Sequence, residues 1–127
     1  MINLTYQIKE KVKEFLPRVY NRKAPAGAEY PYAIISKRGY GDNVNESDFI
    51  YIIELIDNNT DTTEIETLES QMMKSIELNG LDHFCYEDEF LNFEMFYDDN
   101  YSDESDDNNE YLNSRVLEFL VRAYFYK

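Results

Sequence analysis

Residues 113–127 read NSRVLEFLVRAYFYK, and this closing stretch decides which fold the chain can adopt. Every second side chain from position 117 is apolar, which is the period of a β-strand: Leu117, Phe119, Val121, Ala123 and Phe125. The other parity mixes charged with apolar and aromatic residues: Glu118, Leu120, Arg122, Tyr124 and Tyr126. The pattern therefore predicts a long sheet strand with one face in the core and a second face that forms part of a binding surface.

Two amphipathic helices are expected elsewhere in the chain. Helical spacing of apolar residues predicts the first over residues 3–16, with Asn3 as its N-cap. The second follows Asp61, the expected N-cap, and stops at Gly80. Its expected buried stripe is Ile65, Leu68, Met72 and Ile76.

Three further strands are expected from period-two or continuous apolar patterns. They are residues 32–37, 49–56 and 90–97. Residues 49–56 read FIYIIELI, so apolar that a central strand with both faces covered is predicted. A short extended piece is expected within residues 18–21, and residues 81–86 fit either a short extended piece or a loop.

These elements predict an α+β fold with residues 1–127 in a single domain: a mostly antiparallel sheet of about four strands, with two helices packed on one face. The other face would carry many apolar side chains, more than soluble monomers usually leave bare. Contact with identical subunits is the expected cover. The predicted subunit interface consists of Phe90, Phe96, Leu120, Arg122, Tyr124 and Tyr126.

Composition and charge exclude several classes of function. A net charge of −14 argues against a grip on nucleic-acid backbone and against adhesion to anionic lipid. The chain is 43% apolar and 16% aromatic, which argues against disorder along its whole length. Its single cysteine, Cys85, excludes an internal disulfide and fits a reducing compartment. No signal peptide and no membrane-spanning run is recognised, so a cytosolic protein without a membrane partner is expected.

Residues 98–110 form an acid-rich segment, expected to be a mobile loop between two antiparallel strands. Its seven acids could lie exposed or face the lumen of a ring: Asp98, Asp99, Asp103, Glu104, Asp106, Asp107 and Glu110. Four of these acids match the spacing of an EF-hand loop, but Tyr101 occupies a ligand position and Glu104 replaces the required glycine. A solvated charge run is therefore favoured over a calcium site.

No catalytic motif is recognised. His83 and Cys85 are the only residues of their types, so a tetrahedral zinc site cannot be built, and nothing specifies a base aimed at the thiol. The acids at residues 87–89 lack a recognisable pocket that would separate their pKa values. The chain is expected to be a non-enzyme with no cofactor and no metal.

Basic residues are unevenly distributed. Residues 75–114 contain thirteen acids and no Lys or Arg, whereas six of the twelve basic residues precede residue 24. An acidic end and a basic end suit head-to-tail packing in a ring. Chance combined with a need for solubility is an equally good explanation.

The order of elements resembles the tail terminator, or tail completion, proteins of long-tailed bacteriophages and prophages. Four stretches carry the resemblance: AGAEYPYAII, FIYIIELID, TTEIETLESQM and the final RVLEFLVRAYFYK. The acid-rich insertion at residues 98–110 departs from that pattern. The resemblance implies a small α+β subunit that assembles into a hexameric ring, stops growth of the tail tube and docks to the head-side connector.

The expected partners are therefore other copies of this chain, the tail tube protein and the head-side connector or head-closure protein, with genome DNA passing through unbound. The expected location is the tail or neck of a virion assembled in the host bacterial cytoplasm. Two alternatives remain open: another neck component, such as a head-closure or head–tail joining protein, and an acidic binding module that mimics DNA.

Overall fold

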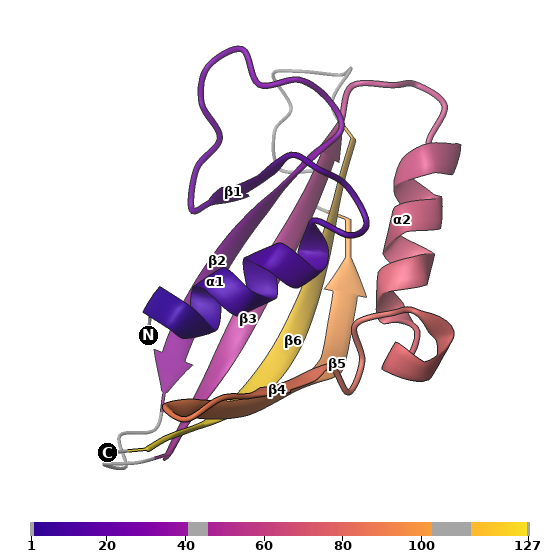
Figure 1. The fold of residues 1–127 in the computed structure, drawn as a ribbon. Coiled ribbons are helices and arrows are strands. Elements are labelled where there is room, and N and C mark those ends of the chain that lie inside the picture. The colour runs from indigo at the N-terminus through magenta and orange to yellow at the C-terminus, as the bar shows by residue number, and fades with distance from the viewer. Residues whose placement is uncertain (1, 41–45, 103–112, 127) are drawn as a thin grey trace.

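The computed structural model describes residues 2–40, 46–102 and 113–126. The elements in chain order are α1 (Ile2–Val12), β1 (Val19–Asn21), β2 (Tyr32–Tyr40), β3 (Glu46–Asp57), α2 (Thr63–Met73), the 3-10 helix η1 (Ile76–Leu78), β4 (Cys85–Glu87), β5 (Leu91–Tyr101) and β6 (Asn113–Phe125) (Figure 1).

The strands form one curled, mixed sheet in the order β1-β2-β3-β6-β5-β4, shaped like half of a barrel (Figure 1). β1 pairs in parallel with β2, and every other pairing between these strands is antiparallel. The α+β class is confirmed, but the prediction of about four mostly antiparallel strands is wrong. The two additional strands, β1 and β4, are three residues each. β1 lies within the extended piece expected at residues 18–21 and β4 overlaps residues 81–86, but neither was counted among the four strands, and only the ladders at the sheet edges place them in the sheet.

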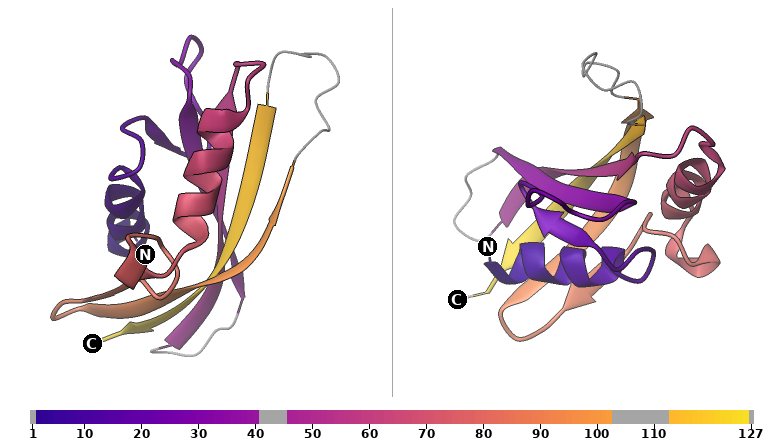
Figure 2. Two further views of the ribbon diagram at one scale, coloured as in Figure 1. Left: turned by 90° about the vertical axis from the view of Figure 1, so that its right-hand side faces the viewer. Right: turned by 90° about the horizontal axis from the view of Figure 1, so that it is seen from above.

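Both helices lie on the same face of the sheet, as predicted (Figure 2). We call this the inward face. Its buried cluster joins Leu4 and Ile8 of α1 and Ile65 of α2 with Tyr51 of β3 and Phe119 of β6. The predicted core parity of β6 is confirmed from Leu117 to Ala123, whereas Phe125 is only partly buried at the strand's end.

The apolar stretch at residues 49–56 lies inside β3, between β2 and β6, so the prediction of a central strand is confirmed. Within the single chain described, only one face is covered, and cover of the other face by further subunits stays a prediction. Ile50, Ile52 and Ile56 point away from the helices and are partly exposed, and no other described element lies over them (Figure 2). The apolar run therefore reflects a second surface as well as a core.

The first helix starts earlier than predicted, and Asn3 is not its N-cap. The Asn3 side chain lies within α1, where its Nδ2 donates to Asp88 Oδ2 at 3.0 Å and its Oδ1 accepts from Gln7 at 3.3 Å. This tertiary contact ties the start of α1 to the turn between β4 and β5. A side chain suited to capping is thus used for a long-range contact that local sequence does not reveal.

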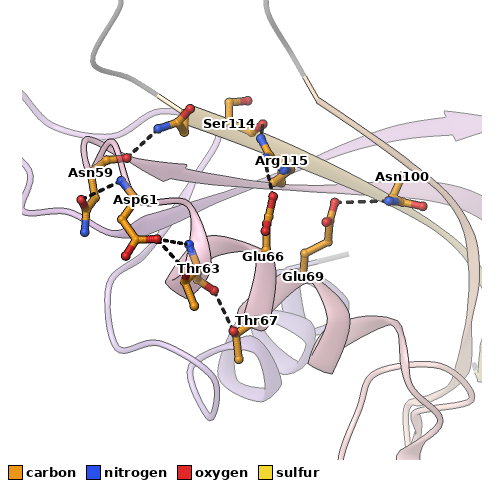
Figure 3. A network of polar contacts seen from close by, with 10 residues as sticks. Asn59, Asp61, Thr63, Glu66, Thr67, Glu69, Asn100, Ser114 and Arg115 are labelled. Atoms are coloured by element: carbon orange, nitrogen blue, oxygen red, sulfur yellow. Dashed lines mark hydrogen bonds and ion pairs between the residues drawn. The ribbon is translucent and has the colours of Figure 1, made fainter.

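The second helix is shorter than predicted. Thr62 occupies the N-cap position, although the Asp61 carboxylate still accepts the Thr63 N–H at 3.0 Å and hydroxyl at 2.6 Å (Figure 3). The helix ends at Met73 because Lys74 is extended. Gly80 closes the turn after η1, where an added Cβ would lie 1.9 Å from the Lys74 carbonyl oxygen. Ile76 therefore lies in η1, partly exposed, and not in the buried stripe.

Polar contacts hold α2 against the ends of β5 and β6 (Figure 3). Glu66 pairs with Arg115 at 3.2 Å, and Glu69 accepts from Asn100 Nδ2 at 3.2 Å. These contacts join segments that lie 49 and 31 residues apart in the chain.

The acid-rich segment begins later than predicted. β5 continues to Tyr101, so Asp98 and Asp99 belong to a strand, with an irregularity in the pairing between Tyr97 and Asp99. The prediction of a loop from residue 98 is wrong for these positions. The other predicted acidic residues lie outside the described part of the chain: Asp103, Glu104, Asp106, Asp107 and Glu110.

Candidate functional site

The face of the sheet opposite the helices, which we call the outward face, carries a row of apolar side chains across its middle strands. Leu120 of β6 is in register with Ile50 of β3 on one side and with Phe96 of β5 on the other. All three side chains are partly exposed. We call these three residues the apolar row. Antiparallel sheets commonly leave one face to water, but that face is then usually polar, so an apolar row at its centre is unusual.

A charged pair, formed by Glu118 and Arg38, flanks the apolar row on one side. Glu118 Oε1 lies 3.3 Å from the Arg38 guanidinium and accepts a hydrogen bond of 3.3 Å from the Tyr101 hydroxyl. The Arg38 side chain is well exposed, so the ion pair contributes little to stability, on the order of 0–1 kcal/mol. Its main effect is to place opposite charges beside the apolar row.

A second charged pair lies on the other side. Arg122 Nε is 3.4 Å from Asp48 Oδ1, and Arg122 is in register with Glu94 of β5. Glu94 in turn contacts His83 Nδ1 at 3.2 Å. The His83 ring meets the Phe96 ring edge-on, with centroids 5.3 Å apart. An apolar centre between charged flanks is the composition found in protein–protein interfaces.

Two exposed tyrosines extend this face toward the C-terminal end of β6. The Tyr124 and Tyr126 rings lie 5.6 Å apart, and the Tyr126 hydroxyl donates to Glu87 at 3.3 Å. Phe90 lies in the turn between β4 and β5, is 66% exposed, and accepts the Tyr126 N–H through its carbonyl. Phe90 thus lies at the margin, whereas the other five predicted interface residues lie on or directly beyond the outward strand positions. Their role in subunit contact remains a prediction.

Sequence reasoning missed Arg38 and Asp48 as members of this face. Each pairs with a β6 residue far along the chain, 80 residues away for Arg38 and 74 for Asp48. Cross-strand register alone brings these charges together, and neither position carries a local signal.

The other candidate chemistry does not assemble into a reactive centre. Cys85 is exposed with a free thiol, and His83 is directed to Glu94, Asp82 and the Phe96 ring. In the described ranges, no group of three or more His, Cys, Asp or Glu side chains could hold a metal ion.

Near Asp98 and Asp99, the pKa of Tyr97 is raised chiefly by burial, with the Asp99 carboxylate adding to the shift.

No model of a known protein family and no curated protein sequence matches this chain. None of the helices in the described residues is long and apolar enough to cross a membrane.

Proposed function

We propose that this protein is a non-enzymatic structural subunit that assembles with copies of itself through the outward face, and that it acts as a tail terminator in a long-tailed bacteriophage. In this function a ring of subunits caps the tail tube and docks to the head-side connector in the neck of the virion. The supporting observation is the apolar row of Ile50, Leu120 and Phe96, which lies on a sheet whose other face already holds the core.

The chemistry of this face favours a protein partner. The apolar row supplies surface whose burial is favourable, and the flanking pairs Arg38–Glu118 and Asp48–Arg122 supply opposite charges that can fix the register of a partner. The net charge of −14 disfavours nucleic acid in the same place. A copy of this chain is the partner that needs no further component.

The particular function rests on the resemblance in the order of elements. The stretch AGAEYPYAII leads into β2, FIYIIELID forms most of β3, TTEIETLESQM covers most of α2, and RVLEFLVRAYFYK runs through β6. Under this proposal the tail tube protein and the head-side connector are the other partners. Genome DNA passes through the ring without being bound.

Native mass spectrometry of the purified protein over a range of concentrations tests the assembly. Rings of about six subunits are expected, and a strict monomer at high concentration would contradict the proposal. Leu120→Asp places an unpaired charge in the apolar row and should shift the population toward monomer. Leu78→Asp is the matched control, because Leu78 lies on η1, away from the outward face, and is 62% exposed.

Two further results separate the alternatives. A gene for a tail tube protein directly downstream, with connector genes upstream, supports a terminator over another neck component. A DNA mimic should instead bind a basic nuclease or repressor as a monomer, and deletion of residues 103–109, which follow the end of β5 at Tyr101, should abolish that binding. For a terminator, the same deletion should leave the fold intact, because it spares β5.

A further inference from the structure

A basic groove lies between α1 and the β1–β2 edge of the sheet, apart from the outward face. It has a volume of about 680 Å³, which is in the range of ligand-binding pockets, of about 300–1,000 Å³. α1 contributes Lys9 and Tyr6, the residue after β1 is Arg22, β2 contributes Lys37, and Tyr51 of β3 also lines the groove.

The charge of this groove is opposite to that of the molecule. Lys9, Arg22 and Lys37 are three of only twelve basic residues in a chain with twenty-six acids, and none of the nine described residues that line the groove is acidic. Neither Lys9 nor Arg22 forms an ion pair with another described residue. Two cations that form no ion pair within the described residues, in a groove whose described lining has no acid, favour an anionic ligand.

One backbone contact and one side-chain contact are formed by two of these residues. Arg22 has a φ of 71°, and its N–H donates to the Ile35 carbonyl at 2.8 Å, which continues the pairing of β1 with β2. The Lys37 amine lies 5.1 Å from the centre of the Phe49 ring. The first contact fixes the backbone from which the Arg22 side chain projects.

The floor of the groove is neutral and polar. The Tyr51 and Thr5 hydroxyls are 2.7 Å apart, so they form one hydrogen bond. Burial raises the pKa of Tyr51 above its ordinary value, and the phenol therefore keeps its proton at neutral pH. No negative charge arises beneath the ligand.

We propose that this groove binds the carboxylates of an acidic peptide, and that a second copy of this chain supplies the peptide through its acid-rich residues 98–110. This inference rests on the proposed self-assembly. Residues 98–110 carry seven acids and no basic residue, so the two surfaces are complementary in charge. The remaining negative charge of the two subunits is screened over about 8 Å at physiological salt, so the local contact decides the sign of the interaction.

The position of the groove suits a head-to-tail contact. β2, which lines the groove, is separated by β3 and β6 from β5, which contains Asp98 and Asp99. The strand β2 and the end of β5, where the acid-rich segment starts, therefore lie toward opposite edges of the sheet (Figure 1). A contact between two different surfaces of identical subunits generates a ring when the rotation closes.

A labelled peptide of residues 98–110 tests the groove directly by fluorescence anisotropy. The protein carries Leu120→Asp, which the proposed function expects to shift the population toward monomer, so that neighbouring copies compete less. Adding Lys9→Gln and Arg22→Asn should weaken binding by about 2- to 30-fold, since two exposed ion pairs are lost. Asn tolerates the left-handed backbone at position 22, which limits the damage to the fold. Lys23→Gln is the matched control, because this exposed lysine does not line the groove.

A peptide with every Asp and Glu replaced by Asn and Gln should not bind. Equal binding of this neutral peptide, or unchanged binding to the Lys9→Gln/Arg22→Asn variant, would overturn the proposal. Saturation by inorganic phosphate without any binding of the acidic peptide would also overturn it, and would assign the groove to a small anion.

The oligomeric state of the wild-type protein separates this inference from the proposed function. Assembled wild type with no peptide binding overturns the groove proposal alone. A wild type that stays monomeric overturns both the proposed function and the second copy as the source of the peptide.

Discussion

Replacing Phe119 by alanine tests the assignment of the two faces of β6. Phe119 is fully buried on the inward face, in register with Tyr51 of β3 and Tyr97 of β5. Its ring meets the Tyr97 ring at 67°, with centroids 5.9 Å apart. Phe119→Ala removes this contact and leaves a cavity beneath both helices.

The expected cost is large relative to the stability of a domain of this size. Replacing a buried Phe by Ala costs about 3–5 kcal/mol, and the lost edge-to-face pair is about 0.5–1.5 kcal/mol of that total. Total stability is on the order of 5–15 kcal/mol. At about 4 °C per kcal/mol, the melting temperature should fall by about 12–20 °C.

Tyr124→Ala is the control, because Tyr124 lies on the same strand, faces outward and is 39% exposed. In the monomer it should cost less than about 1 kcal/mol. Urea unfolding followed by far-UV circular dichroism at two protein concentrations gives both values. The loss for Phe119→Ala should not depend on concentration, whereas a loss for Tyr124→Ala should appear mainly at the higher concentration, where subunits associate. Equal losses at low concentration would refute the assignment of the faces.

Two further predictions concern the turns that connect the elements. The Phe90 N–H and the Tyr86 hydroxyl donate to the Asp88 carboxylate and hold the pKa of Asp88 below its ordinary value of 3.8. This contribution to stability is present above that value and is lost as the pH falls through the lower folded-state pKa. Asp88→Asn should therefore reduce stability at neutral pH and make the acid-induced loss smaller, as measured by urea unfolding across a pH series; an unchanged pH profile would contradict the role of this carboxylate. Gly80→Ala should cost about 3 kcal/mol or more, the upper end of the usual range for overpacking, because the added Cβ meets the backbone carbonyl of Lys74 at 1.9 Å. Gly27→Ala, at a φ of 80° with nothing within 4 Å, should cost only the backbone strain of about 1–2 kcal/mol, and thermal melting that ranks it as the worse substitution would contradict this account.

The periodic elements of the fold could be predicted because their signal is local. The alternation in β6 and the helical spacing around Ile8 and Ile65 follow from which side chains must leave water. The ends of these elements could not be predicted. Asn3 is used for a contact with Asp88, and Lys74 ends α2 six residues before Gly80, because tertiary contacts outweigh local capping preferences.

The candidate site was predictable only in part, for the same reason. Leu120, Arg122 and Tyr124 were recognised as a second surface from the amphipathic parity of β6 alone. The partners that complete this surface, Arg38 and Asp48, come from β2 and from the start of β3. The basic groove likewise joins Lys9 and Lys37, which no sequence pattern connects.

The sequence by itself determined the α+β class, the two helices on one face, the central position of residues 49–56 and the two distinct faces of the final strand. Each depends on a periodic pattern of burial within one segment. Only the tertiary structure decided the six-stranded curled sheet, the parallel pairing of β1 and the gathering of scarce positive charge in one groove. These features depend on the register between distant segments, which the packing of the whole chain sets and no single segment encodes.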